Sequence, residues 1–429
     1  MVTTAVNILS DILSDHRTFW PFFFLRRIRL TTDKGPLLAL HAARCTPYDC
    51  ATTLEGRMQI TDVKPMKMNY GPRGMFLVKI ESDSGLCGWG EGGISGRELG
   101  MEAIVESFKP QLIGQDPRRI DHLWQVMFRG GFFESGTVMS GAISAVDIAL
   151  WDLVGKHLKT PCWQLLGGRS RDRVECYTHA GLNSVKERVA EGWRYIRMGA
   201  ETGAADPNEF DPDRAVHNVI RTMTKARELA GDDVKLCIDF HQRFNPPTAA
   251  QACNGIASMR PYFVEDPLRS VSPKSYVAFR RRTAVPIASG EACSSKWEFQ
   301  QLIEEDAIDY ARIDVCNVGG LTEARKVAAL AETHFIDVVP HCPIGPLCCA
   351  ASVHLAAAIP NFAVLEYVFG QDKAPGVFST AIKFKAPCFE IPDAPGLGIE
   401  VNEAKMADYP WKPWLPPMYH RPDGGFTNW

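Results

Sequence analysis

The chain has 429 residues, of which 45% are hydrophobic and 23% charged, with a formal net charge of −3 at pH 7. This composition is ordinary for a soluble globular protein, and the length favours two domains over one. The lack of a basic excess argues against nucleic acid as a partner. The 13 cysteines are scattered without a CxxC pair, which indicates free thiols in a reducing compartment, so we expect a cytoplasmic protein.

The first 56 residues differ from the rest of the chain. Their apolar run at residues 19–25 is too short to span a bilayer. Asp11 and Asp15 precede this run, where a signal peptide would carry basic residues. We therefore expect residues 1–56 to be a poorly ordered extension, with a targeting or membrane role as the weaker alternative.

From residue 57 the sequence predicts a small α+β domain. Short apolar runs separated by turn residues are typical of an antiparallel meander. These predicted strands cover residues 59–63, 75–81 and 86–91. Apolar positions at helical spacing follow, over residues 101–112, 119–128 and 139–157. Residues 57–170 are therefore expected to form an N-terminal capping domain.

From residue 171 strand patterns alternate with helix patterns. After strands at residues 174–177 and 195–198, six apolar runs each end in an acidic or imidazole residue. The endings recur roughly every 25 residues, about one strand, loop, helix and loop. They are Asp239, Glu265, Glu291, Asp314, His341 and Glu366. Eight such strands predict an α/β fold with a (β/α)8 barrel over 171–385, whose strand ends meet at one mouth. The proline- and glycine-rich segment 386–429 is expected to return to the cap or close over the mouth.

Three of these acids end consecutive strands and indicate a metal site. A single acid at such a place is more often a surface or capping residue. Asp239, Glu265 and Glu291 at equal spacing, however, would repel one another unless a cation lies between them. Because the set offers only oxygen, Mg²⁺ is the metal that fits it.

Two histidines are candidates for proton transfer. Asp314 ends the strand before His341, and a carboxylate beside an imidazole fixes its tautomer and raises its pKa. His341 is therefore a candidate general base, although a lone histidine is more often a core residue. His241 lies two residues after Asp239 and four strands away from His341. We expect it on the opposite side of the mouth, where it can act as a general acid.

These groups together fit the loss of water from a hydroxylated carboxylic acid. A Mg²⁺ that binds the substrate carboxylate lowers the cost of the enediolate formed when the α-proton leaves. A β-hydroxyl can then depart if an acid protonates it. Glu366, in its protonated form, is a candidate for a hydrogen bond to the substrate carboxylate, a place for which Tyr367 competes.

Beyond these residues, several segments in order resemble the enolase superfamily and, within it, the mandelate racemase subgroup. The resemblance runs from about residue 58 to the C-terminus and includes GMFLVKIE at 74–81, GWGE at 88–91, DFH at 239–241 and PHCPIGP at 340–346. It implies a capping domain, a barrel and a C-terminal piece that rejoins the cap. It also implies a homo-oligomeric enzyme that acts on a small molecule, without a nucleic-acid or membrane partner.

The resemblance also implies residue roles. Asp239, Glu265 and Glu291 match the Mg²⁺ ligands. His341, paired with Asp314, matches the base that removes the proton from C2, and His241 matches the acid at the C3 hydroxyl. The use of a Lys or His base with Mg²⁺ on an enediolate is the general scheme of this superfamily. The implied reaction is dehydration of a sugar acid, with D-galactonate as the best guess, to a 2-keto-3-deoxy sugar acid.

Departures from the family pattern, including Asp266 and an insert near residues 203–213, leave alternatives open. Arg197 stands where many members carry lysine, and arginine does not deprotonate, which argues against a lysine-type racemase. Ala292 and Cys293 follow Glu291, where a larger residue is expected. The alternatives are another aldonate such as gluconate or mannonate, an acid-sugar epimerase or cycloisomerase, and a paralogue without turnover. A substrate of opposite hand at C2 would exchange the roles of His241 and His341.

Overall fold

The structure, a computed structural model, describes residues 25–32, 35–42, 58–134, 136–200, 206–268, 272–368 and 373–427. It divides into two units, Met1–Arg57 and Met58–Trp429. In the first unit, β1 (Leu25–Thr32) and β2 (Gly35–Ala42) pair as an antiparallel hairpin. The extension predicted for residues 1–56 otherwise lies outside the described residues.

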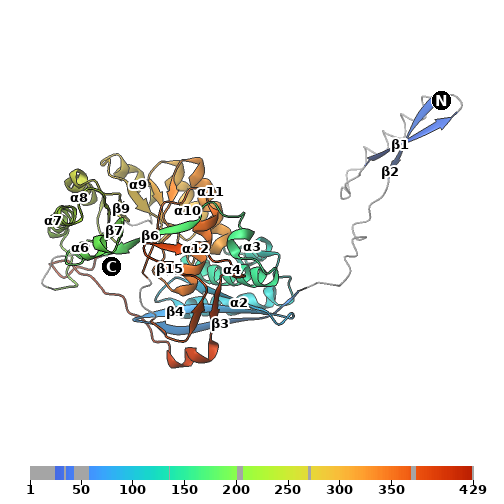
Figure 1. Ribbon diagram of the computed structural model, residues 1–429, viewed down its shortest axis with the longest axis horizontal. Coiled ribbons are helices and arrows are strands. Elements are labelled where there is room, and N and C mark those ends of the chain that lie inside the picture. The colour runs from blue at the N-terminus through green and yellow to red at the C-terminus, as the bar shows by residue number, and fades with distance from the viewer. Residues whose placement is uncertain are drawn as a thin grey trace. The chain divides into compact units, whose positions relative to one another are not determined.

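The second unit begins with the α+β cap. An antiparallel meander in the order β3-β4-β5 opens it. The strands are β3 (Ile60–Tyr70), β4 (Arg73–Ser82) and β5 (Cys87–Gly92). Three helices follow, α2 (Glu98–Leu112), α3 (Ile120–Arg129) and α4 (Thr137–His157). Figure 1 shows β3, β4 and α2 together at one end of this unit. Strands β4 and β5 and the three helices lie close to their sequence-predicted ranges, whereas β3 continues to Tyr70, well beyond the predicted end at residue 63.

Helix α4 is the central support of the cap. It is buried continuously from Ser140 to Gly155 because it packs on β5 on one side and on the barrel helix α11 (Gly320–Thr333) on the other. The close contact with β5 requires glycine: a Cβ on Gly90 would lie 2.0 Å from the carbonyl oxygen of Ala145. Helix α4 is long and apolar enough to cross a membrane, but most of its apolar stretch is buried inside the fold, as in the core helix of a soluble protein.

Eight parallel strands close into the predicted (β/α)8 barrel. Neighbours along the chain pair from β6 through β12, and β13 pairs back with β6. An isolated bridge between Val338 of β12 and Phe362, in the segment just before β13, completes the ring. The strands are β6 (Arg173–His179), β7 (Tyr195–Gly199), β8 (Lys235–Asp239), β9 (Phe263–Glu265), β10 (Ile287–Ser289), β11 (Tyr310–Ala311), β12 (Asp337–Val338) and β13 (Leu365–Glu366).

Side chains from the barrel strands fill its interior, so it is a packed core. Tyr177, Phe263 and Val339 belong to this buried cluster. Several of the surrounding helices have N-cap residues. The side chains of Asp211, Asn245 and Ser295 accept hydrogen bonds from the first-turn amides of the helices that begin at Pro212, Pro246 and Lys296. The helices are α5 (Cys162–Leu165), α6 (Val185–Ala190), α7 (Pro212–Ala230), α8 (Pro246–Ile256), α9 (Pro273–Arg280), α10 (Lys296–Glu304), α11 and α12 (Pro346–Ala358), with a 3-10 turn η1 (Ala257–Met259).

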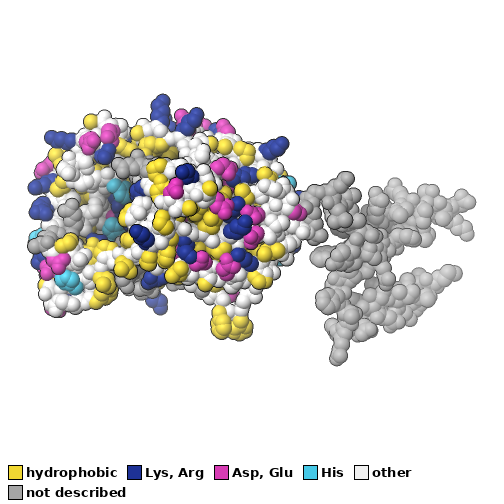
Figure 2. Space-filling model, turned by 90° about the horizontal axis from the view of Figure 1, so that it is seen from below, with side chains coloured by type: hydrophobic (Ala, Val, Ile, Leu, Met, Phe, Trp, Pro, Cys, Tyr) yellow, Lys and Arg dark blue, Asp and Glu magenta, His cyan; other side chains and the backbone are white. Residues whose placement is uncertain are grey.

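The C-terminal segment connects barrel and cap. It forms β14 (Phe378–Thr380), β15 (Phe384–Lys385), β16 (Cys388–Glu390), β17 (Ile399–Val401) and η2 (Glu403–Asp408). Strand β16 pairs with β6 of the barrel. Further on, the amide of Asn69 in the cap donates to the carbonyl of Tyr409 at 3.0 Å. On the face shown in Figure 2, positive and negative side chains are interspersed over the described residues, consistent with the small net charge.

Candidate active site

The three predicted metal ligands lie at neighbouring strand ends. Asp239 and Glu265 are the last residues of β8 and β9 and stand opposite each other in the strand register. Glu291 follows β10 after the turn residue Gly290. Asp239 and Glu265 are fully buried, while Glu291 is partly accessible. Parallel strands therefore bring these carboxylates to one edge, as the sequence predicts.

Arg197, in the middle of β7, forms ion pairs with two of these carboxylates. Its Nε donates to Glu265 Oε2 at 2.9 Å, and its Nη2 forms a short ion pair with Asp239. The guanidinium is buried, so little water screens these charges. The sequence excludes Arg197 as a base but does not reveal this contact, which depends on the register of β7 against β8.

A second buried arginine contacts one of these carboxylates, Glu265, and also Glu366. Arg312 follows β11 and is fully buried. Its Nη2 pairs with both Glu265 and Glu366, at 2.9 Å from Glu366 Oε2. Its Nη1 donates to the carbonyl groups of Val339 and Pro340. Arg312 therefore links the ends of β9, β11 and β13, a role the sequence analysis missed because the residue carries no motif.

Glu366 lies inside this ionic network. Burial alone would raise its pKa, but Arg312 and His179 hold the pKa of Glu366 well below its usual range. His179 Nε2 lies 3.0 Å from Glu366 Oε1, and the amide of Cys342 donates to Oε2 at 3.0 Å. The sequence analysis expected a protonated Glu366, but these surroundings favour the ionised carboxylate. Tyr367 lines a cavity of about 590 Å³ together with His179 and Trp193.

His341 and Asp314 form the predicted pair. His341 Nδ1 lies 2.7 Å from Asp314 Oδ2, and Asp314 Oδ1 accepts the amide of Cys316 at 2.7 Å. The carboxylate therefore fixes the imidazole and leaves Nε2 toward Glu291, 3.3 Å away. Burial lowers the pKa of His341, but Glu291 and Asp314 outweigh it and raise the pKa to about 9.

His241 has the opposite electrostatic surroundings. Its Nε2 lies 2.8 Å from Asp239 Oδ2. The backbone turns sharply here, with φ of 47° at His241 and 58° at Gln242, a left-handed conformation that few side chains adopt. Burial, and then the charge of Arg197, lower the pKa of His241 to about 4. Two imidazoles with opposite pKa shifts therefore stand four strands apart.

The donor set fits a divalent cation. Asp239, Glu265 and Glu291 offer only oxygen, as Mg²⁺ prefers. Glu265 Oε1 forms an ion pair with Arg312 but accepts no hydrogen bond among the described residues. Arg197 already neutralises part of the charge, so a cation bound here shares Asp239 and Glu265 with the guanidinium.

The cap contributes a positive group that the sequence analysis did not single out. Arg73 opens β4 just after the Gly71 turn, and its guanidinium stacks over the ring of Trp414 at 5.1 Å. Burial lowers its pKa, while Glu366 and Glu291 act to raise it. Arg73 is therefore a cap residue whose charge interacts with these barrel carboxylates. It lies at the turn between β3 and β4.

Comparison with known proteins gives the same architecture. Residues 52–167 match the mandelate racemase / muconate lactonizing enzyme N-terminal domain, and residues 181–405 match the enolase C-terminal domain-like family. The chain is 34% identical over 385 residues to a D-galactonate dehydratase of Cronobacter sakazakii, an alignment that spans 87% of this chain and 100% of that protein.

Solved structures resemble the same part of the chain. An enolase from Pantoea ananatis with bound D-gluconate and Mg is 30% identical, with a TM-score of 0.81, over 86% of this chain and 99% of that one. The 3,6-anhydro-D-galactonate cycloisomerase from Zobellia galactanivorans is 28% identical, with a TM-score of 0.74, over 82% and 100%. With the cap, the closed barrel and the carboxylates at its strand ends, these matches show that the chain is an enzyme of the enolase superfamily, in the mandelate racemase subgroup.

Proposed function

We propose that the protein is a Mg²⁺-dependent dehydratase of a sugar acid, with D-galactonate as the first substrate to test. The observation that carries the proposal is the pair of imidazoles, His341 and His241, placed at strand ends on either side of three carboxylates. Similarity to a D-galactonate dehydratase and to a gluconate-bound enolase supports the substrate class.

Each residue has a chemical task in this proposal. Asp239, Glu265 and Glu291 would hold Mg²⁺, which would supply positive charge against the negative charge that develops on the substrate carboxylate. His341 Nε2 accepts the C2 proton, while Asp314 holds Nδ1 and steadies the resulting imidazolium. His241 delivers a proton to the C3 hydroxyl as it leaves as water.

The protonation states of the two histidines in the metal-free site can be compared with their proposed roles. In the metal-free site His341 holds a proton at neutral pH and His241 does not, which is the reverse of these roles. The charge of Glu291, a proposed metal ligand, is the largest cause that raises the pKa of His341. The two roles therefore have to be tested with Mg²⁺ bound. The reverse assignment, with His241 as the base, applies to a substrate of the opposite C2 hand.

The reaction is tested by incubating the full chain with Mg²⁺ and a panel of aldonic acids. We expect a 2-keto-3-deoxy product from at least one acid, and none after EDTA treatment. A panel without product from any acid, in protein shown to bind Mg²⁺, would overturn the dehydratase assignment. Deuterium exchange at C2 without water loss would instead indicate an epimerase or cycloisomerase.

The histidine roles are tested by deuterium exchange at C2 of the accepted acid. His341→Asn is expected to abolish exchange, and His241→Asn to retain exchange while losing product. The opposite pattern would exchange the two roles. His217→Asn is the matched control, because His217 is an exposed histidine on α7 that hydrogen-bonds only its own helix backbone among the contacts described.

A further inference from the structure

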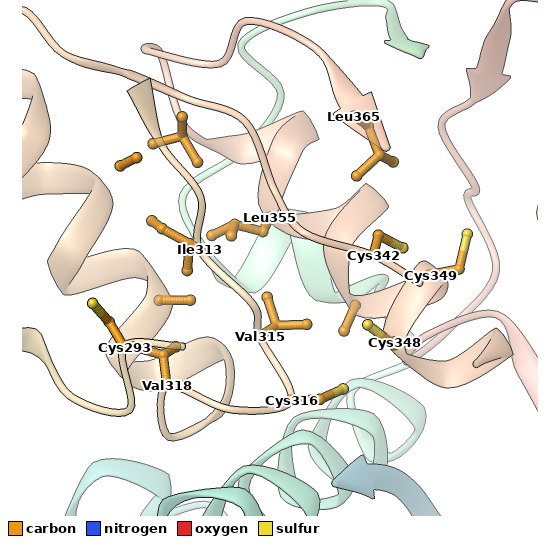
Figure 3. Packing of buried hydrophobic residues seen from close by; sticks show 14 of the residues in the cluster. Cys293, Ile313, Val315, Cys316, Val318, Cys342, Cys348, Cys349, Leu355 and Leu365 are labelled. Atoms are coloured by element: carbon orange, nitrogen blue, oxygen red, sulfur yellow. The ribbon is translucent and has the colours of Figure 1, made fainter. Parts of the chain in front are cut away.

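Four cysteines lie close to the His341–Asp314 pair. Cys316 follows Asp314, Cys342 follows His341, and Cys348 and Cys349 lie in the first turn of α12. Neighbouring thiols in this group influence one another's pKa: Cys316 with Cys348, Cys348 with Cys342, and Cys342 with Cys349. All four side chains are buried. Figure 3 shows them between the loop after β11 and the start of α12.

Three ligand atoms of this region converge. A carboxylate oxygen of Asp314 and the sulfur atoms of Cys316 and Cys348 all lie within 4.8 Å of one another. Zn²⁺ binds sulfur at about 2.3 Å and oxygen at about 2.0–2.2 Å, so its ligands stand roughly 3.5–4 Å apart. Small side-chain adjustments therefore suffice to place these three atoms around one ion.

The carboxyl group of Glu91, from the cap, lies next to Cys348. Glu91 Oε2 accepts the amide of Cys348 at 2.9 Å, whereas Glu91 Oε1 has no hydrogen-bond partner among the described residues. The side chain is fully buried, and burial raises the pKa of Glu91 to about 8. A buried acceptor without a partner is uncommon and marks unmet polar capacity beside the thiols.

We propose that Asp314, Cys316 and Cys348 form a second metal site, for a thiophilic ion such as Zn²⁺ or Cd²⁺, separate from the carboxylate site at the mouth. Thiolates select such ions, while Mg²⁺ prefers oxygen, so the two sites differ in the metal they take. Binding releases the two thiol protons to solvent, and two thiolates with one carboxylate then surround the divalent ion.

Occupation of this site inhibits the enzyme through Asp314. The same carboxylate holds His341 Nδ1 at 2.7 Å, so a metal that takes an Asp314 oxygen weakens the hold on the imidazole. Asp314, Cys316 and Cys348 are all fully buried. Because an ion reaches them only when the surrounding packing opens, inhibition develops slowly.

The binding test needs no turnover. The full chain, saturated with Mg²⁺, is titrated with Cd²⁺ while thiolate-to-cadmium absorption in the ultraviolet is followed. We expect saturation at one equivalent, and X-ray absorption that finds two sulfur ligands per Cd²⁺. Absence of the absorption in the wild-type protein would overturn the proposal, whatever the variants do.

Variants assign the ligands. Cys316→Ala and Cys348→Ala are each expected to weaken Cd²⁺ binding at least tenfold. Cys349→Ala is the matched control, because Cys349 is the next thiol on the same helix but stands outside the three-ligand group. Equal Cd²⁺ binding by all three variants would contradict the assignment.

The inhibition experiment rests on the proposed dehydratase function, so metal binding and inhibition are measured separately. In an enzyme that produces keto acid, Zn²⁺ is expected to inhibit slowly, without relief by excess Mg²⁺ and with recovery after EDTA and renewed Mg²⁺. Relief by Mg²⁺ alone would place the inhibitory Zn²⁺ at the carboxylate site and overturn the inhibitory role. A protein that binds Cd²⁺ through thiolates but turns over no acid would refute the function and leave the metal site standing.

Discussion

At the residue scale, Arg197 holds Asp239 and Glu265 together by a fixed charge. Breaking a buried ion pair typically costs about 3–5 kcal/mol, because the remaining charges are left uncompensated. We expect Arg197→Met to lower the melting temperature in EDTA, and Mg²⁺ to restore most of the loss by taking the place of the guanidinium. Thermal unfolding with and without Mg²⁺ measures both effects.

The control for this variant is Arg194→Met. Arg194 precedes the same strand but pairs with Glu175 at the surface, where an ion pair contributes about 0–1 kcal/mol. An Arg197→Met protein that melts equally early with and without Mg²⁺ would show that the arginine supports the fold and does not share its ligands with a metal.

Arg73 gives a second residue-scale prediction. The charge of its guanidinium interacts with Glu291 and Glu366, where a substrate acid would lie between the two domains. One charge-assisted hydrogen bond contributes about 1.5–3 kcal/mol, so Arg73→Gln is expected to raise KM for the accepted acid at least tenfold. Steady-state kinetics should show a smaller change in kcat. Arg118→Gln, a cap arginine that pairs with Asp116 at the surface, should leave both constants unchanged.

Some of the site residues could be predicted from the sequence, and others could not. Asp239 and Glu265 end apolar runs, and parallel strands place such endings side by side, so periodicity alone brings them together. Arg312 and Arg73 carry no pattern of this kind, because a buried arginine is recognised only by the partners that neutralise it. Those partners come from β9, β13 and the cap, distant in the sequence.

At the element scale, α4 and α11 are joined by a buried polar contact. Asp147 on α4 accepts hydrogen bonds from the amide and hydroxyl of Thr322 on α11, at 3.0 and 2.6 Å. We expect Asp147→Ala to lower the free energy of unfolding by about 1–3 kcal/mol, because the Thr322 amide loses its partner. Urea unfolding measures the loss.

The matched control for α4 and α11 is Asp121→Ala. Asp121 on α3 pairs with Lys326 on the same α11, but its side chain is exposed. This substitution should change stability by less than about 0.5 kcal/mol. If the two variants lost equal stability, the buried contact would not be what holds cap and barrel together.

The elements themselves were largely predictable, and their contacts were not. The apolar spacing of α4 predicts a helix, but a helix that is apolar on every side gives no face to assign to a partner. Its contact with β5 follows from Gly88 and Gly90, whose missing side chains admit the helix backbone. Strands β11 and β12 are only two residues long, so their own sequences give a weak strand pattern. The residues that follow them in the sequence are the better indication that a strand ends there.

At the scale of the whole molecule, a buried histidine makes stability depend on pH. Burial lowers the pKa of His354 on α12 to about 4, and its Nδ1 accepts the amide of Trp163 at 3.1 Å. The folded pKa lies below the unfolded value of about 6.5, so the unfolded chain binds more protons between these values. This contribution therefore destabilises the fold as pH falls from about 6.5 toward 4 and is absent at higher pH.

The substitution His354→Asn removes the group that binds a proton on unfolding, while the Asn side chain keeps an oxygen that can accept the amide of Trp163. We expect the variant's free energy of unfolding to fall less steeply between pH 6.5 and pH 4, by up to about 3 kcal/mol relative to the wild type. Urea unfolding at several pH values measures the difference. Parallel pH curves for the two proteins would show that His354 does not bind a proton on unfolding in this range.

The division at Arg57 gives a prediction for the whole chain. The capping sheet begins at β3, and the cap, the barrel and the C-terminal segment lie within one unit from Met58 to Trp429. Because every proposed ligand and proton-transfer residue belongs to that unit, a chain starting at Met58 is expected to keep the melting temperature and the turnover of the full protein. Calorimetry and the keto-acid assay on both chains measure this. A large loss of turnover with an unchanged melting temperature would assign residues 1–57 a part in the reaction, and a loss of both would assign them to the fold.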